Sequence, residues 1–228
     1  MKKFVLLILM VCINQISAQP KDNQEIDINA YVTSSAGSQL PVRVPINSET
    51  IGSFYLYKNW NNSGFVYLKD KRVLKLNAFN YNTYTDLFEA QISADSSFSF
   101  SKNSADSIVI NNKIFKVTPN TGSPTDGYIE VLFNKKDLFF VKKYKSIVEI
   151  AKPNPMSGNF DFPDKIRQEE SYYIKNDYGF VPVSLTKKSI LKIFNDNEKE
   201  IKSFVKKNNL SYKKEFDVVN ILNFLSQL

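Results

Sequence analysis

Histidine is absent from the 228-residue chain, and cysteine occurs only once, at Cys12. Without histidine the chain cannot build a Ser-His-Asp triad, a Cys-His dyad or a histidine-ligated zinc site. It also lacks the usual general base near neutral pH. Cys12 lies in an N-terminal segment that we expect to be removed, which leaves the mature chain no disulfide, thiolate nucleophile or cysteine metal ligand. The hydrophobic core must therefore hold the fold together.

Arginine is also scarce, because it occurs only at Arg43, Arg72 and Arg167, although the formal net charge of the chain is +7. Lysine supplies the rest of the positive charge, and removal of Lys2 and Lys3 with the N-terminal segment lowers the net charge by two. Arginine is the residue best suited to bidentate phosphate recognition, so nucleic acid is not an expected partner. The partners that fit an exported basic protein are an envelope protein or an anionic envelope polymer.

The first 18 residues have the order of a secretory signal peptide. Lys2 and Lys3 precede an apolar run over 4–13, and small residues end the segment at Ser17 and Ala18. We expect export through the secretory pathway and cleavage after Ala18, which gives a periplasmic or secreted protein. The alternatives are a membrane anchor and a lipoprotein acylated at Cys12. The run has about half of the roughly 20 apolar residues that a spanning helix needs. Cys12 also lies inside the apolar run rather than at its end.

The chain after Ala18 divides into a polar lead-in, a strand-rich region and a helical end. Residues 19–48 are polar and interrupted by prolines, which predicts a flexible lead-in with one strand near 26–32. Residues 49–184 contain short apolar runs separated by polar turns, typical of β-hairpins. The expected strands lie at 54–57, 65–68, 73–76, 87–92, 98–100, 108–110, 113–115, 127–133, 138–144, 147–150, 172–174 and 180–183. Residues 152–168 carry three prolines and a glycine, which predicts a long loop.

The apolar spacing changes to that of helices from Thr186 onward. Three amphipathic segments are expected in 185–228, the last with Val218, Ile221, Leu222 and Leu225 on one face. Runs of strands followed by helices indicate an α+β fold, with an antiparallel, β-meander-rich body and a small C-terminal three-helix segment packed on it. No segment of the mature chain is apolar and long enough to cross a membrane as a helix.

Several strand, turn and helix signatures are spread over roughly 50–228, namely 52–56, Trp60, 64–68, 81–89, 185–194 and 201–208. In these residues the chain resembles exported Bacteroidetes-type proteins of unknown function. The resemblance implies export and a β-rich body with a lysine-rich helical tail, and it implies no particular activity.

Candidate catalytic patterns are few. Ser184-Leu185-Thr186-Lys187 matches the S-x-x-K of penicillin-binding enzymes, but no K-T-G element accompanies it. The simpler interpretation is that Ser184 or Thr186 caps the first helix. Acidic residues that can supply the two carboxylates of a glycoside hydrolase are Asp161, Asp164, Glu169, Glu170 and Asp177. A calcium loop is the alternative around Asp161 to Asp164. The calcium-loop pattern itself is missing. No catalytic residue, metal site or cofactor is therefore assigned.

The best candidate binding residues are Trp60, Tyr84 and Tyr81, which lie in two polar turns of the β-rich region. Aromatic residues among polar neighbours either pack back onto the sheet or contact a ligand, and Trp and Tyr are favoured in binding hot spots. We therefore expect a non-enzymatic binding or scaffolding protein of the cell envelope. The alternative is a carboxylate- or Ser/Lys-based hydrolase that acts on envelope polymers.

Overall fold

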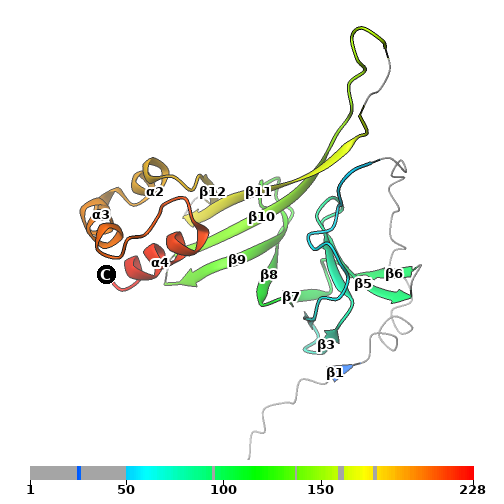
Figure 1. Cartoon of the computed structure of the whole chain (residues 1–228). Coiled ribbons are helices and arrows are strands. Elements are labelled where there is room, and N and C mark those ends of the chain that lie inside the picture. Colours follow the sequence, from blue (N-terminus) through cyan, green and yellow to red (C-terminus); the bar gives the residue numbers. More distant parts are fainter. Residues whose placement is uncertain (1–24, 27–49, 94–95, 137, 159–161, 177–178) are drawn as a thin grey trace, which may run out of the picture.

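The computed structural model describes residues 25–26, 50–93, 96–136, 138–158, 162–176 and 179–228 (Figure 1). The expected signal peptide, Asp161, Asp177 and almost all of the lead-in lie outside these residues. Of the lead-in, only Glu25–Ile26 is described, as the short strand β1.

Nine of the described strands form the main sheet, in the order β1-β3-β2-β7-β8-β9-β10-β11-β12. Their bounds are β2 Gly64–Leu68, β3 Val73–Leu76, β7 Ala105–Ile110, β8 Lys113–Thr118, β9 Gly127–Lys135, β10 Leu138–Glu149, β11 Lys165–Asn176 and β12 Gly179–Val183. From β7 to β12 each strand pairs antiparallel with the next one in the chain. The predicted meander is therefore confirmed.

A second sheet of three strands is inserted between β3 and β7. It consists of β4 Phe79–Asn82, β5 Leu87–Ser93 and β6 Ser96–Ser99. Because of this insertion, β2 pairs antiparallel with β7, about forty residues further along the chain. The turn at Asn111 and Asn112 joins β7 to β8 as predicted, and both asparagines have positive φ (48° and 65°).

Three α-helices follow the last strand, as predicted, and complete an α+β fold. They are α2 Lys187–Ile193, α3 Glu198–Lys207 and α4 Glu215–Leu225, and the short 3₁₀ helix η1 Asn195–Asn197 lies between the first two. Ile190, Val218 and Leu222 are fully buried against Phe140 and Ile174 of the main sheet. The Oγ1 of Thr186 accepts a hydrogen bond from the backbone N–H of Ser189, so Thr186 is the residue that caps α2. None of the described helices is long and apolar enough to cross a bilayer.

Besides the polar turn expected around Tyr81, where strand β4 lies, the sequence prediction is wrong in two places. The segment 54–57 is not a strand, and only an isolated bridge joins Tyr55 to Asn82. The predicted loop at 152–168 is shorter, because β11 already begins at Lys165. The predicted strand at 147–150 continues β10, which extends to Glu149 and pairs with β11 along its length.

The two sheets enclose a core of aromatic rings. Tyr81 stacks on Phe88 with ring centroids 4.5 Å apart and planes 14° apart. Phe88 in turn meets Phe115 and Tyr128 of the main sheet edge to face, at 5.0 and 4.9 Å. All four rings are buried. Pairs of this kind contribute about 0.5–1.5 kcal/mol beyond the area that they bury, so the ring cluster is a major part of the joint between the sheets.

The carboxylate of Asp86 lies at the edge of this cluster and binds groups from both sheets. It accepts hydrogen bonds from the hydroxyl of Tyr81 and from the ammonium groups of Lys102 (2.5 Å) and Lys143 (3.0 Å). The backbone N–H of Tyr128 lies 3.3 Å from both of its oxygens. Burial lowers the pKa of Lys143, and the charge of Asp86 only partly opposes this effect. Asp86 therefore links the turn before β5 to β9 and β10 through charge-assisted bonds.

Substitution of Gly127 tests the Asp86 link. A Cβ at this residue would lie 1.7 Å from Oδ2 of Asp86, and its φ of +91° is unfavourable for other residues. We expect Gly127→Ala to lower the free energy of unfolding by about 3 kcal/mol or more. Urea denaturation followed by circular dichroism measures this change.

The matched control is Gly122→Ala, because Gly122 also has a positive φ (+82°) but has nothing within 4 Å of a Cβ. This variant should lower the free energy of unfolding by only about 1 kcal/mol, which is the cost of a positive φ for alanine. Equal losses in the two variants would show that the Asp86 contact contributes nothing.

Candidate functional site

Trp60 lies at the surface of the body, which we define as the two sheets together, and its side chain is half-buried. Its ring contacts the edge of Tyr55, with centroids 4.8 Å apart and an interplanar angle of 60°. Tyr55 is fixed in turn, because its hydroxyl donates a hydrogen bond to Oε2 of Glu89 (2.9 Å). The backbone carbonyl of Trp60 also accepts hydrogen bonds from Asn62 and Phe79. The ring is thus held in place with part of its surface open to solvent.

Tyr84 is the most accessible of the three candidate residues, with 48% of its surface exposed. One side of its ring rests on Phe54, at a centroid distance of 4.7 Å. Trp60 contacts Tyr55 instead, and no ring contact joins Trp60 to Tyr84 in the part of the chain that the structure describes. The two residues are therefore separate surface features.

Tyr81 belongs to the core, and a ligand at the surface does not reach its ring. Its relative exposure is 0%, and its hydroxyl binds Asp86. The expectation of a surface aromatic does not hold for Tyr81 because it occupies β4, where its ring fills the space between the two sheets. Sequence alone shows a polar turn here and not the direction of the side chain.

A second group of charged side chains lies on the main sheet beside α4. The buried ammonium of Lys142 is 2.5 Å from Glu215 of α4 and 3.4 Å from Glu170 of β11. Burial acts to lower the pKa of Lys142, but the hydrogen bond and charge of Glu215, with the nearby carboxylates, outweigh it and raise the pKa. Glu130 similarly binds Lys113 (3.0 Å) and the hydroxyl of Tyr144 (2.5 Å). The Lys142–Glu215 ion pair joins α4 to the sheet, whereas the bonds of Glu130 join strands β8, β9 and β10 to one another.

The residues of the hydrolase hypothesis are spread over several elements. Ser184 precedes the Thr186 cap and is exposed, and Lys187 is an exposed residue at the start of α2. Glu169 binds Arg167 (2.9 Å), and Asp164 accepts a hydrogen bond from the backbone N–H of Ala151 (2.8 Å). No group of three or more potential metal-binding side chains occurs within the described residues.

A feature that the sequence prediction missed is an arm that projects from the body beyond the ends of β10 and β11 (Figure 1). We use "the arm" for residues 150–158 and 162–164. Three of its apolar side chains are largely exposed: Ile150 (75%), Met156 (98%) and Phe162 (71%). Isolated apolar residues are normal on a surface, whereas a group of exposed apolar residues is a feature of interaction sites. The arm is therefore a candidate interaction site.

The tip of the arm has a defined backbone. The carbonyl of Asn154 accepts a hydrogen bond from the N–H of Gly158 (2.8 Å), and its side chain accepts one from the N–H of Met156 (2.9 Å). Gly158 has a φ of +69°, which closes this turn, and Pro153 and Pro155 restrict the chain around Asn154. Met156 is thereby displayed on a preformed turn.

The base of the arm is braced against the body. Ile51 forms a parallel bridge with Lys165, and Nε2 of Gln168 donates a hydrogen bond to the carbonyl of Tyr55 (2.6 Å). Oγ of Ser146 on β10 lies 2.5 Å from Oγ1 of Thr83. These bonds fix the direction in which β10 and β11 leave the sheet.

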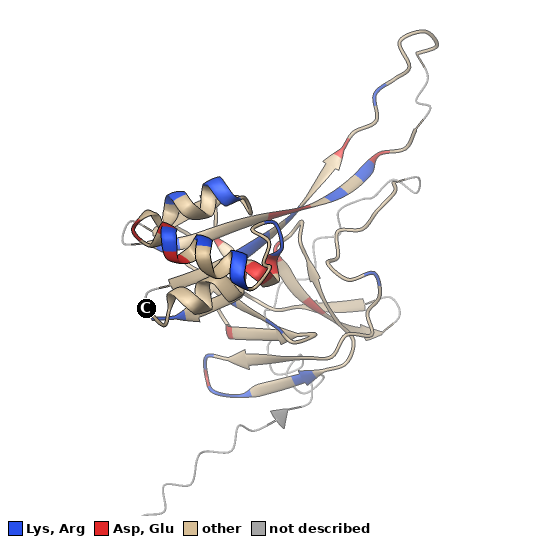
Figure 2. Ribbon diagram, turned by 60° about the vertical axis from the view of Figure 1, so that its left-hand side comes forward, with Lys and Arg blue, Asp and Glu red and all other residues tan. Residues whose placement is uncertain are grey.

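Charge is distributed differently over the helices and the arm. Figure 2 shows many lysines on α2 and α3, mixed with acidic residues. Among them, Lys202 and Glu198 form an ion pair within α3. The described residues of the arm include two charged ones, Lys152 and Asp164, and the sequence between Gly158 and Phe162 adds Asp161. The arm is thus suited to apolar rather than electrostatic contacts.

Comparison of the chain with models of known protein families, with curated protein sequences and with solved structures gives no match.

Alkaline titration tests whether the phenol groups of four tyrosines of the strand-rich region are buried. Burial is the largest cause that raises the pKa of Tyr81, Tyr128 and Tyr144, and it raises the pKa of Tyr57 to about 12. The unfolded chain loses these protons near pH 10, whereas the folded chain keeps them. Stability should therefore be constant below about pH 10 and fall as the pH rises above it.

The measurement is tyrosinate absorbance recorded together with circular dichroism. We expect part of the tyrosinate signal to appear only as the protein unfolds. If every tyrosine titrates with a midpoint near pH 10 while the circular dichroism stays native, the burial of these phenols is contradicted.

Proposed function

We propose that this chain is an exported, non-enzymatic binding protein of the cell envelope that engages a protein partner through the arm. The observation that carries this proposal is the display of Ile150, Met156 and Phe162 on a braced projection with little charge. Asp164, Glu169 and Glu170, the described carboxylates of the hydrolase hypothesis, already bind other groups of the chain. This favours a binding protein over the hydrolase alternative.

The physical argument for the arm rests on preorganisation. Ordering a loop at the moment of binding costs free energy, and a segment that is already fixed avoids most of this cost. The bonds of Asn154 and the bridge at Lys165 supply that order before any partner is present. Methionine is suited to contact surfaces because its unbranched, polarisable side chain adapts to the partner.

The proposal of export rests on the sequence of residues 1–18 and on the resemblance to exported proteins. N-terminal sequencing of the mature protein from its native host should give Gln19, because signal peptidase prefers a small residue such as Ala18 before the cut. Recovery of the stable protein with Met1 would contradict export with cleavage.

Substitution of the exposed arm residues tests the binding role. We expect the double variant Met156→Asp/Phe162→Asp to lose at least about tenfold in affinity for a partner captured by the wild-type protein from envelope extract. Two desolvated apolar contacts would be lost and two charges placed in an apolar interface. Quantitative pull-down with identification of the captured proteins by mass spectrometry measures this loss.

The matched control is Ile114→Asp, because Ile114 is an exposed apolar residue (45%) on β8, away from the arm. Thermal unfolding should show that all variants remain folded. Equal capture of the same proteins by the wild type and by the arm variant would refute a binding role for the arm, as would a loss that Ile114→Asp reproduces.

A further inference from the structure

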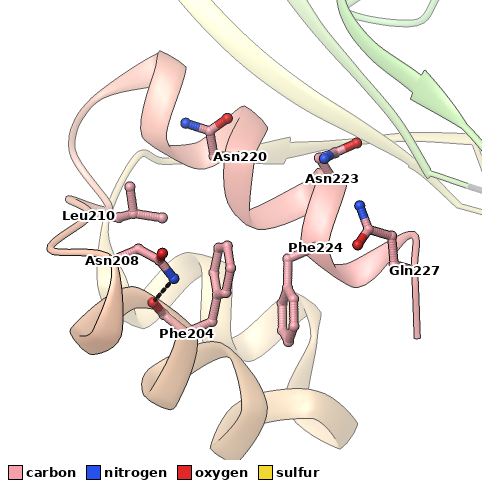
Figure 3. A pocket seen from close by; sticks show the side chains of 7 residues that line it. All are labelled: Phe204, Asn208, Leu210, Asn220, Asn223, Phe224 and Gln227. Atoms are coloured by element: carbon pink, nitrogen blue, oxygen red, sulfur yellow. Dashed lines mark hydrogen bonds between the residues drawn. The ribbon is translucent and has the colours of Figure 1, made fainter.

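An open pocket of about 270 Å³ lies at the surface between α3 and α4, apart from the arm and from Trp60, and is called the cavity below (Figure 3). Its lining consists of Phe204, Asn208, Leu210, Asn220, Asn223, Phe224 and Gln227. The α4 residues of this set lie on the face opposite Val218 and Leu222, which pack on the sheet. The cavity therefore lies outside the apolar contact that packs α4 on the sheet.

Its polar lining is made of carboxamides, with no charged side chain. Two of these amides are oriented by neighbouring groups. Nζ of Lys135 is a pure donor and lies 2.8 Å from Oδ1 of Asn223, which leaves the Asn223 amide N–H groups unused by that bond. Nδ2 of Asn208 donates to the carbonyl of Phe204 (2.8 Å), which leaves the Asn208 side-chain oxygen as an acceptor. The cavity thus offers a donor and an acceptor in fixed orientations.

The other two carboxamides have their full hydrogen-bonding capacity available. Neither Asn220 nor Gln227 forms a side-chain hydrogen bond to any other residue in the described part of the chain. Each carboxamide has an oxygen that accepts and an NH₂ group that donates two hydrogen bonds. A ligand that matches this lining must itself donate and accept at several positions.

The apolar part of the cavity comes from two stacked rings and Leu210. Phe204 and Phe224 have centroids 4.2 Å apart and planes only 5° apart. Figure 3 shows the two rings side by side between the helices, with carboxamides on both sides of them. A ligand that fits this arrangement has an apolar face as well as polar groups at its edge.

We propose that this cavity binds a neutral saccharide. A sugar hydroxyl both donates and accepts, as the four carboxamides require, and the C–H groups of a sugar ring supply an apolar face for Phe204, Phe224 or Leu210. The seven lining side chains are neutral, and the ammonium of Lys135 beside them is already bound to Asn223, so a neutral sugar matches the lining better than a charged one. The small volume suits one or two sugar units.

An extended peptide fits the same site less well. Peptide recognition by strand addition uses free backbone N–H and C=O groups at a sheet edge. Here the backbone groups of α3 and α4 are engaged in their own helices, so only side chains are available. The proposal is independent of the arm and of any protein partner.

The test uses the full mature chain and three neutral trisaccharides, namely maltotriose, cellotriose and chitotriose. Trigalacturonate and acetyl-trialanine-amide represent the anionic sugar and the peptide. We expect at least one neutral trisaccharide to shift the side-chain NH₂ signals of Asn220, Asn223 and Gln227 in nitrogen-15 NMR spectra. Asn220→Ala/Gln227→Ala should weaken that binding at least about tenfold, because two hydrogen bonds are lost.

The matched control is Asn61→Ala/Asn120→Ala, which removes two exposed carboxamides elsewhere and should leave the affinity unchanged. Both double variants should stay folded, since none of the four side chains bonds to another described residue. Three results would each overturn the proposal: no binding of any neutral trisaccharide, equal weakening by the control, or occupation of the cavity by trigalacturonate or the peptide instead.

Discussion

The rest of the structure depends on the partly buried carboxylate of Asp86. It joins the turn before β5 to β10 through Lys143 and to β9 through the backbone N–H of Tyr128. Its bonds to ammonium groups are charge-assisted and stronger than bonds between neutral groups, so these partners hold one another in position. Because β10 also forms one side of the projecting ribbon, the same link determines where the arm leaves the body. The stiffness of the proposed binding surface thus begins in the polar contacts between the two sheets.

Local features of the fold were predictable from sequence, whereas long-range pairings were not. The hairpin around Asn111 and Asn112 and the apolar stripe of α4 follow from residue type and spacing within a few positions. The pairing of β2 with β7 skips the whole inserted sheet. The two lysine partners of Asp86 lie 16 and 57 residues away in the chain, and no local pattern shows such contacts. The resemblance to exported proteins remains a prediction.

The candidate site was predictable only as a set of residue types. Polar turns with aromatic residues indicated surface rings, which describes Tyr84 and part of Trp60, but Tyr81 points into the core. The sequence of the arm predicts a proline-rich loop. This loop projects from the body because contacts at its base fix the direction of β10 and β11, and the sequence does not show those contacts. The cavity between α3 and α4 arises where the polar face of one helix meets Phe204 of the other. That meeting depends on how two helices pack, which their separate sequences do not specify.

The central claim is that the body holds the arm as a preformed contact surface for a partner. The most direct measurement is site-specific photocrosslinking in the native host, with a photoreactive amino acid at Met156 or, for comparison, at the exposed Ile114 of β8. The account predicts one dominant protein adduct from residue 156 that is absent from residue 114. No adduct from residue 156, or the same adducts from both positions, would contradict it.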